Sequence, residues 1–150
     1  MQWTQLPLGP LQTNAYVLIN DDKEAIIFDP GGQGLELVEW LQTEKLKPLA
    51  ILLTHAHFDH IGAVDVVRDA FNCPVYLHTL ENDWLGNPEK NRSTSFLGGE
   101  AIIVRPADVL IEKEESISIG AFHFQVYATP GHSPGSVSYY CTEEQIVFFR

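Results

Sequence analysis

The stretch Thr54–Gly62, THAHFDHIG, holds three of the chain's six histidines and one aspartate within six residues. The apolar run 49–53 before it predicts a buried strand, and apolar residues at helical spacing over 61–71 predict an amphipathic helix after it. The polar cluster therefore lies on a loop between a strand and a helix. Functional sites of α/β proteins are commonly placed on such loops.

The side chains of this stretch suit a metal ion. His55 and His57 are two residues apart, so an extended backbone directs both rings to the same side. Asp59 and His60 follow where the chain turns into the helix. Imidazole and carboxylate groups are ligands for zinc, with iron and manganese as competitors. The alternative is a set of ordinary surface histidines beside a polar helix cap, but four candidate ligands in six residues favour the metal site.

The composition predicts one folded domain over residues 1–150. Apolar residues make up 45% of the chain and charged residues 19%, which is typical of a soluble globular protein. A formal net charge of −11 argues against a nucleic-acid or anionic-membrane partner. A small anionic substrate remains compatible with this charge, since a bound metal ion reverses the local potential.

The sequence shows no signal for export or membrane insertion. No apolar run approaches the length that spans a bilayer, and the first five residues, MQWTQ, lack the basic region of a signal peptide. Cys73 and Cys141 have neither disulfide-framework nor metal-ligand spacing, so we expect two buried free thiols in a reducing compartment. These features predict a cytoplasmic protein.

Before the polar cluster, local patterns predict a series of elements: a loop over 6–11, strands over 14–19 and 25–28 joined by a hairpin turn, and a helix with Leu35, Val38 and Leu41 on its buried face. Pro48 is expected to stop that helix. Asp29 follows the second strand directly. It is either a turn residue only, or a residue that supports the metal loop by accepting a hydrogen bond.

After the cluster, further strands are expected over 74–77, 107–111, 117–119, 121–128, 137–141 and 146–149. His78 and His123 are expected to have structural or surface roles rather than ligand roles. The segment 80–105 predicts short helical turns and a surface loop, which either shapes a substrate pocket or only connects its neighbours.

A second motif lies downstream, at Thr129–Ser136, TPGHSPGS, where a Pro-Gly turn presents His132 on a loop. With the HAHFDH motif at 55–60 and Asp29 upstream, the chain resembles the metallo-β-lactamase superfamily over its whole length, and most of all its glyoxalase II-like small bacterial hydrolases. This resemblance implies an α+β fold, an αββα sandwich of two mixed sheets with helices outside. It also implies that His55, His57 and His132 hold a first metal ion, and that Asp59 and His60 belong to a second.

One departure from the family pattern bears on the second metal. The pattern continues, after a strand such as 146–149, with a Gly-Asp pair whose aspartate bridges both ions, and later with a further histidine. This chain ends at Arg150. We therefore expect the last strands and helix of the second half to be missing, the second site to bind weakly or not at all, and activity to be much reduced. An apolar face left uncovered there would favour association between copies of the chain.

The resemblance implies hydrolysis by a zinc-activated water that attacks the carbonyl of a thioester, such as an acylglutathione, or of an ester. Asp59 is the expected catalytic residue, orienting the nucleophile or accepting its proton. Two alternatives stay open: an iron-dependent persulfide dioxygenase, and a fragment without turnover. Lactone or β-lactam hydrolysis ranks lower.

Overall fold

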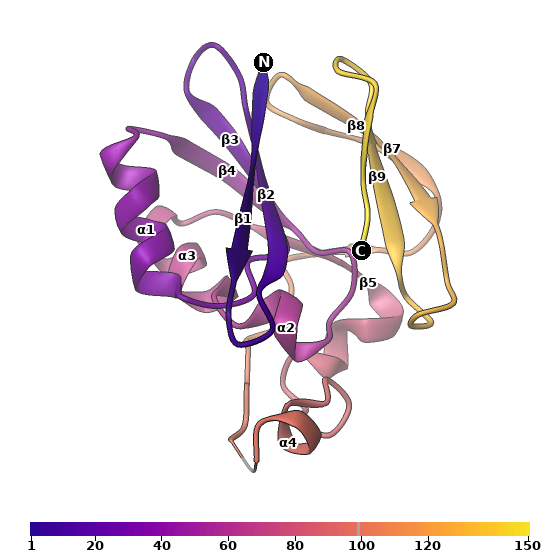
Figure 1. Ribbon diagram of the computed structural model, residues 1–150. Helices are drawn as coiled ribbons and strands as arrows, with labels where there is room; N and C mark the ends of the chain where they lie inside the picture. Colours follow the sequence, from indigo (N-terminus) through magenta and orange to yellow (C-terminus); the bar gives the residue numbers. More distant parts are fainter. Residues whose placement is uncertain (99) are drawn as a thin grey trace.

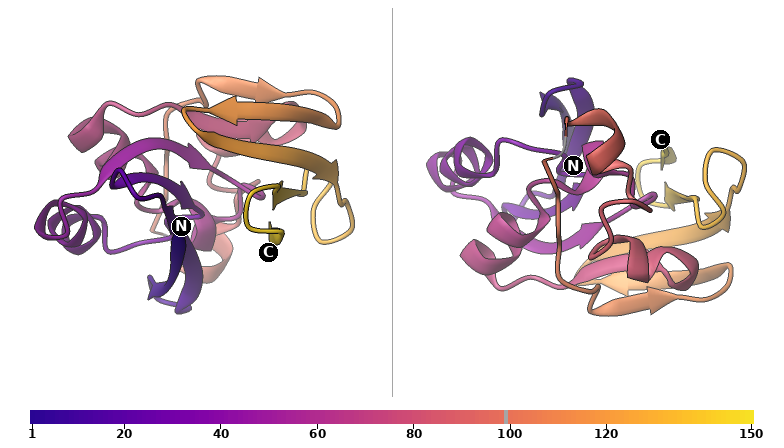
Figure 2. Two further views of the ribbon diagram at one scale, coloured as in Figure 1. Left: turned by 90° about the horizontal axis from the view of Figure 1, so that it is seen from above. Right: turned by 90° about the horizontal axis from the view of Figure 1, so that it is seen from below.

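Two β-sheets pack face to face in the computed structural model of the protein, which describes every residue except residue 99 (Figure 1). The first sheet has six strands and the second has four. Two helices cover the outer face of the first sheet, so the described residues form helix, sheet and sheet layers (Figure 2). The expected α+β sandwich is therefore confirmed, with helices on the first sheet only among the described residues.

The strands are β1 Gln2–Leu8, β2 Thr13–Ile19, β3 Glu24–Phe28, β4 Lys47–Leu52, β5 Val75–His78, β6 Val109–Ile111, β7 Glu115–Ile119, β8 Phe122–Ala128, β9 Val137–Cys141 and β10 Ile146–Phe148. The helices are α1 Gly34–Thr43, α2 Phe58–Ile61, α3 Val64–Phe71, the 3₁₀ helix η1 Thr79–Trp84 and α4 Ser93–Phe96. The first sheet runs in the order β1 to β6, antiparallel up to β3 and parallel from β3 onward. The second, β10-β9-β8-β7, is antiparallel throughout, rather than mixed as the resemblance implied.

Aromatic side chains fill the space between the two sheets. Phe28 from the first sheet stacks on Phe148 from the second, with ring centroids 4.0 Å apart, and also contacts Phe124 and Tyr139. On its other face the first sheet packs against α1 and α3. Because its central strands are buried on both faces, they are continuous apolar runs rather than alternating ones.

Three details of the first half differ from expectation. The segment predicted as a loop over 6–11 begins inside β1, because Pro7 is tolerated on a strand at the edge of the sheet. Pro48 lies within β4 rather than stopping a helix, beside the register shift at Ala25/Ile26 in the β3–β4 pairing. In α1 the buried face carries Leu37 and Leu41, whereas Leu35 is 78% exposed.

Other predictions are confirmed. The hairpin joins β2 to β3, α2 begins within the polar cluster and α3 follows it, and the described residues of the segment 80–105 contain only η1 and α4. Cys73 and Cys141 are buried free thiols, and His123 is exposed. His78 has a structural role, because its Nδ1 accepts a hydrogen bond from the amide of Leu80 at the start of η1.

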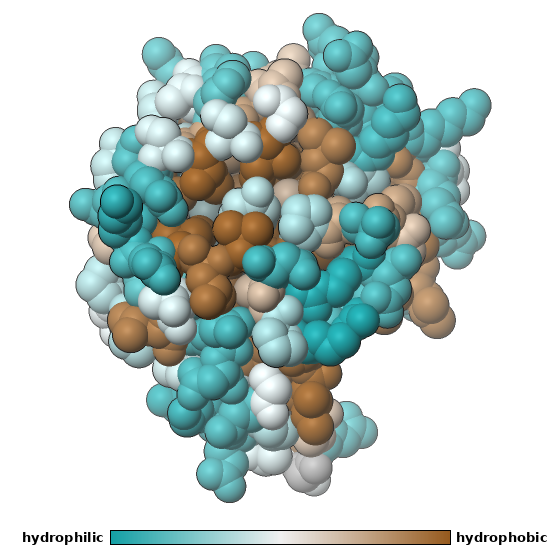
Figure 3. All heavy atoms as spheres, turned by 180° about the vertical axis from the view of Figure 1, so that it is seen from behind, coloured by the Kyte–Doolittle hydropathy of each residue, from teal (hydrophilic) through white to brown (hydrophobic). Residues whose placement is uncertain are grey.

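No helix in the described part of the chain has the length and apolar character needed to span a bilayer. The face opposite the view of Figure 1 carries apolar side chains in patches between hydrophilic ones (Figure 3). The edge strand β6 is partly exposed, with Val109 and Leu110 at 37% and 39%. Apolar area of this extent is ordinary on a folded protein surface.

Candidate metal centre

Two loops form the candidate site. The first runs from the end of β4 to α2 and carries His55 and His57, and the second joins β8 to β9 and carries His132. The amide of Val137 donates to the carbonyl oxygen of Thr54 at 2.9 Å, and the phenol of Tyr139 donates to the carbonyl oxygen of Leu53 at 2.7 Å. These bonds hold the start of β9 beside the end of β4, and so bring the two loops together.

Three histidine rings converge where the loops meet. The centroids of His55, His57 and His132 lie 4.8–4.9 Å from one another, with ring planes 83–89° apart. One nitrogen from each ring lies within 4.8 Å of the others, and Nδ1 of His57 is 3.0 Å from Nε2 of His132. The structure thus brings together the three residues expected to hold the first metal, although His132 lies 75 residues after His57.

A buried chain of hydrogen bonds orients His55. The hydroxyl of Thr54 donates to Oδ2 of Asp29 at 2.6 Å and lies 3.0 Å from Nδ1 of His55. Since the hydroxyl has only one proton and gives it to Asp29, it accepts from Nδ1 of His55. The unprotonated Nε2 of His55 is buried and has no hydrogen-bond partner among the residues that the structure describes. Asp29 also accepts a hydrogen bond from the amide of Thr54 at 2.8 Å. Of the two predicted alternatives, Asp29 therefore has the role of supporting the metal loop through hydrogen bonds.

Asp59 and His60 lie beside this cluster. The ring of His60 is 4.0 Å from that of His55, and its Nε2 is 3.5 Å from Oδ2 of Asp59. Its Nδ1 is 3.0 Å from Oδ2 of Asp29, a close contact that is poorly directed as a hydrogen bond. Asp59 accepts a hydrogen bond from the hydroxyl of Thr13 at 2.8 Å. Both residues are near enough for the second site, and their roles as ligands stay predictions.

The local electrostatics keep the three converging histidines neutral. Burial, with the neighbouring imidazoles, lowers the pKa of His55 far below its ordinary value and that of His57 to about 4. Burial and the charge of Arg150 also lower the pKa of His132. For His60, burial lowers the pKa but the Asp29 carboxylate more than offsets it, so the pKa is raised overall.

This donor set fits a divalent metal ion. A neutral imidazole is the form that binds a metal, and Nε2 of His55 is a buried polar atom that no other described residue satisfies. Three histidines with an open fourth position are the ligand set of a catalytic zinc site. The residues present would therefore hold one ion between His55, His57 and His132.

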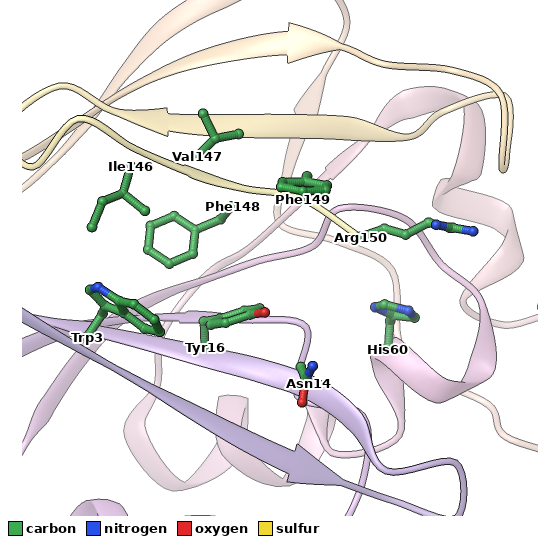
Figure 4. Close-up of a pocket in the computed structure, with 9 residues that line it drawn as sticks. All are labelled: Trp3, Asn14, Tyr16, His60, Ile146, Val147, Phe148, Phe149 and Arg150. Atoms are coloured by element: carbon green, nitrogen blue, oxygen red, sulfur yellow. The ribbon is translucent and has the colours of Figure 1, made fainter.

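Two cavities reach the site. A cavity of about 360 Å³ is lined by Leu11, His57, Phe58, Asp59, Arg92, Phe96 and His132. Another, of about 400 Å³, lies between β1–β2 and β10. Figure 4 shows its apolar lining from Trp3, Tyr16 and Phe148, with His60 and Arg150 at one end. The first cavity is bordered by two of the three converging histidines, so it gives a small molecule access to them.

The segment 80–105 shapes the site rather than only connecting its neighbours. The indole of Trp84 stacks on the ring of His57, with centroids 5.6 Å apart. The carbonyl oxygen of Asn91 accepts a hydrogen bond from the amide of Phe58 at 2.8 Å. The side chain of Asn91 is fully buried and bonds to Trp84, Ser93 and Ile102, which holds the segment in place.

Backbone packing fixes the start of α2. A Cβ atom added at Gly31 would overlap the carbonyl oxygen of Asp59, and one added at Gly62 would overlap that of Gly31. The loop after β3 and the short helix α2 therefore touch main chain to main chain. Only glycine allows an approach this close.

Sequence patterns did not single out Glu81 or Trp84. Glu81 is fully buried and accepts hydrogen bonds from both histidine-bearing loops. Both residues lie in a short polar segment without periodicity. Their partners are distant in sequence, so local spacing carries no signal for these contacts.

The amino-acid sequence is similar to those of two relatives. The chain is 51% identical to "Probable metallo-hydrolase YqgX" of Bacillus subtilis (strain 168), over 98% of this chain and 69% of the relative. It is 33% identical to the "Hydroxyacylglutathione hydrolase" of Bdellovibrio bacteriovorus, over 94% of this chain and 49% of the relative. The chain therefore spans about two thirds of one relative and half of the other.

The chain also superimposes on two solved structures. The chain superimposes on the crystal structure of BLEG-1 B3 metallo-beta-lactamase with a TM-score of 0.94 and 61% identity, over 99% of this chain and 71% of that one. On TTHA1623 in a di-iron-bound form the TM-score is 0.79 with 39% identity, over 98% and 73% of the two chains. The model of the metallo-beta-lactamase superfamily matches residues 8–149. The chain thus belongs to the metallo-β-lactamase superfamily.

Proposed function

We propose that this protein is a metal-dependent hydrolase of thioesters such as an acylglutathione. The convergence of three neutral imidazoles on one point beside an open cavity carries the proposal. The similarity to a hydroxyacylglutathione hydrolase supports the substrate class. The chain matches about half of that relative. The proposal therefore concerns only the hydrolytic reaction at the histidine cluster, which lies within the matched half.

A bound divalent ion would supply Lewis acidity and lower the pKa of a water molecule toward 7. We assign the proton of that water to the carboxylate of Asp59. Its Oδ2 already accepts from Thr13, so Oδ1 is the atom that we assign to the proton. The water oxygen bonds to the carbonyl carbon, the carbon–sulfur bond breaks, and the thiolate leaves without needing a protein acid.

The cavity beside the histidines suggests which acyl groups it accepts. Leu11 and Phe96 border it and are 54% and 62% exposed, so they present apolar surface to a bound molecule. Arg92 lines the same cavity, and its positive charge contributes to the lowered pKa of His57. An apolar wall with one cation suits a substrate that carries both a hydrocarbon part and a carboxylate.

A second candidate is β-lactam hydrolysis, which uses the same attack on a carbonyl carbon. The 61% identity to a B3 metallo-β-lactamase favours it. An iron-loaded oxidation of persulfides is a third candidate, for which the di-iron form of a relative is the supporting observation. The substrates of these reactions differ enough for one panel to separate them.

The test loads the 150-residue chain with zinc, iron or manganese and measures turnover of an acylglutathione, a β-lactam and a persulfide. We expect zinc-dependent thioester hydrolysis that is absent in His132→Ala. Faster β-lactam hydrolysis, or oxygen uptake with a persulfide, would replace the proposal with the corresponding alternative. Equal rates with and without metal in every assay would refute all three.

A further inference from the structure

Glu81 is a fully buried carboxylate outside the histidine cluster. Its Oε1 accepts a hydrogen bond from the amide of Ala56 at 2.8 Å. Its Oε2 accepts from the hydroxyl of Ser133 at 2.5 Å and from the amide of Gly135 at 2.7 Å. All three partners donate, so the acceptor-only carboxylate serves them all. A buried charge is costly unless it is bonded in this way.

The three donors lie on the two loops that carry the converging histidines. Ala56 stands between His55 and His57, and Ser133 follows His132 directly. These donors are 25, 52 and 54 residues from Glu81 in sequence. One carboxylate on η1 thus joins the upstream loop to the downstream loop.

The fit of Glu81 against the downstream loop is close. A Cβ atom added at Gly135 would lie 2.9 Å from Cγ of Glu81 and 3.0 Å from its Oε2. The hydroxyl of Ser133 gives its one proton to Glu81, so it accepts a hydrogen bond from the hydroxyl of Ser136, 2.7 Å away. The turn that presents His132 is therefore packed on this carboxylate.

Apart from the 3.0 Å contact between the His57 and His132 rings, the other hydrogen bonds that join the two loops among the described residues lie on the strand side. Val137 donates to Thr54, and Tyr139 to Leu53. Neither bond reaches the segment between His132 and Gly135. Loss of Glu81 would leave β9 attached to β4 while releasing the turn that carries His132.

We propose that Glu81 is a positioning residue that sets the distance between His132 and the His55–His57 pair, and so determines how tightly the histidine cluster binds a metal ion. The inference rests on the metal site of the proposed function. It adds a residue that touches neither the metal nor the substrate. A residue that only stabilised the fold would affect unfolding without a matching effect on the cluster.

The primary test compares Glu81→Gln with Asn82→Ala, which removes the hydrogen bond that the neighbouring side chain on η1 accepts from the amide of Ala107. Glutamine keeps the volume of Glu81 but turns an NH₂ group toward a donor. We expect a loss of zinc affinity of about tenfold or more in Glu81→Gln by chelator competition. The visible spectrum of the Co²⁺-loaded variant should shift, whereas Asn82→Ala should keep the spectrum. Zinc affinity within twofold of the unaltered chain in Glu81→Gln would overturn the proposal.

Two more variants keep the proposal testable if Glu81→Gln does not fold. Ser133→Ala removes one donor, and Gly135→Ala pushes on the carboxylate while keeping every hydrogen-bonding group. Each should weaken zinc binding severalfold, and unchanged affinity in both would contradict the proposal. Ring signals of ¹⁵N-labelled histidines in the metal-free chain add a readout that needs no metal. The His132 signals should move in these variants, and unmoved signals would count against Glu81 even if the chain bound no zinc.

Discussion

The indole of Trp84 lies nearly parallel to the imidazole of His57, with ring planes 22° apart. A metal ion on His57 would change the charge on that ring and hence the emission of the indole. We predict that zinc titration changes tryptophan fluorescence, and that Trp84→Phe abolishes the change. Trp40→Phe, on α1, is the matched control and should keep it. A response that persists in Trp84→Phe would show that the stacked pair does not report the metal.

Replacement of Asp29 should weaken metal binding without removing a ligand. Its carboxylate accepts from the amide and the hydroxyl of Thr54, and the hydroxyl orients His55. Asp29 has φ 51°, a conformation that asparagine also tolerates, so Asp29→Asn preserves the backbone. We expect a loss of zinc affinity of about 10–100-fold.

Chelator competition measures this loss, with Thr54→Ser and Thr54→Val as the matched pair. Thr54→Ser keeps the hydroxyl and should bind zinc almost normally, whereas Thr54→Val should behave as Asp29→Asn does. Equal affinities in the serine and valine variants would exclude the hydroxyl from the orientation of His55.

The two groups of candidate ligands predict unequal binding. Three neutral imidazoles converge at one point, whereas Asp59 and His60 are the two candidate ligands for a second ion among the described residues. Elemental analysis of the 150-residue chain should find one tightly held ion. His55→Ala should lose it, and His123→Ala, at an exposed histidine, should keep it. Two tightly held ions per chain would contradict this prediction.

Stability of the metal-free chain should fall in acid. The pKa values of His55, His57 and His132 are lowered on folding, so the unfolded chain binds more protons below about pH 6.5. The contribution of these histidines to the free energy of unfolding is therefore complete above that pH. It decreases as the pH falls toward the pKa of His57 in the folded chain, about 4. His60 acts oppositely, since its raised pKa stabilises the fold at low pH and loses that effect as pH rises.

Urea unfolding of the metal-free chain between pH 7.5 and 4 measures this dependence. Because other carboxylates also titrate there, the informative quantity is the difference between the unaltered chain and His57→Gln. The difference should change by less than about 1.4 kcal/mol per pH unit, the limit for one proton. Parallel curves for the two proteins would mean that His57 has the same pKa in both states.

Arg92 should discriminate between acyl groups. If it pairs with a substrate carboxylate in the cavity beside His57, Arg92→Glu should raise KM for anionic acyl thioesters by about tenfold or more and leave neutral ones unchanged. Arg92→Lys keeps the charge and should be intermediate. The same change of KM for charged and neutral substrates would assign Arg92 a general role in shaping the cavity.

The metal loop was predictable because its signal is local. Four candidate ligands stand within six residues, and the apolar patterns on both sides place them where a strand gives way to a helix; His55 and His57 lie on the loop, and Asp59 and His60 lie in α2. The downstream His132 depends on tertiary structure, and only the family resemblance linked it to the loop. Glu81 gave no signal at all, because its partners are set by how η1 packs against both loops.

The predictions about the fold that were wrong also failed because tertiary structure decided the outcome. Pro7 and Pro48 are strand breakers in isolation, but an edge strand and a register shift accommodate them. The face of α1 was misassigned because Leu35 and Leu37 both belong to apolar patterns with helical spacing. Only the position of the sheet decides which of them is covered.

The glycine contact between the β3–α1 loop and α2 limits how this centre can be altered. Since main chain rests on main chain at Gly31 and Gly62, any side chain there displaces the carbonyl of Asp59 or of Gly31. Engineering of metal preference is therefore best confined to the imidazole-bearing positions, whose side chains can be exchanged on an unmoved scaffold. Random libraries should recover almost no replacements at the two glycines, even under selection for altered chemistry.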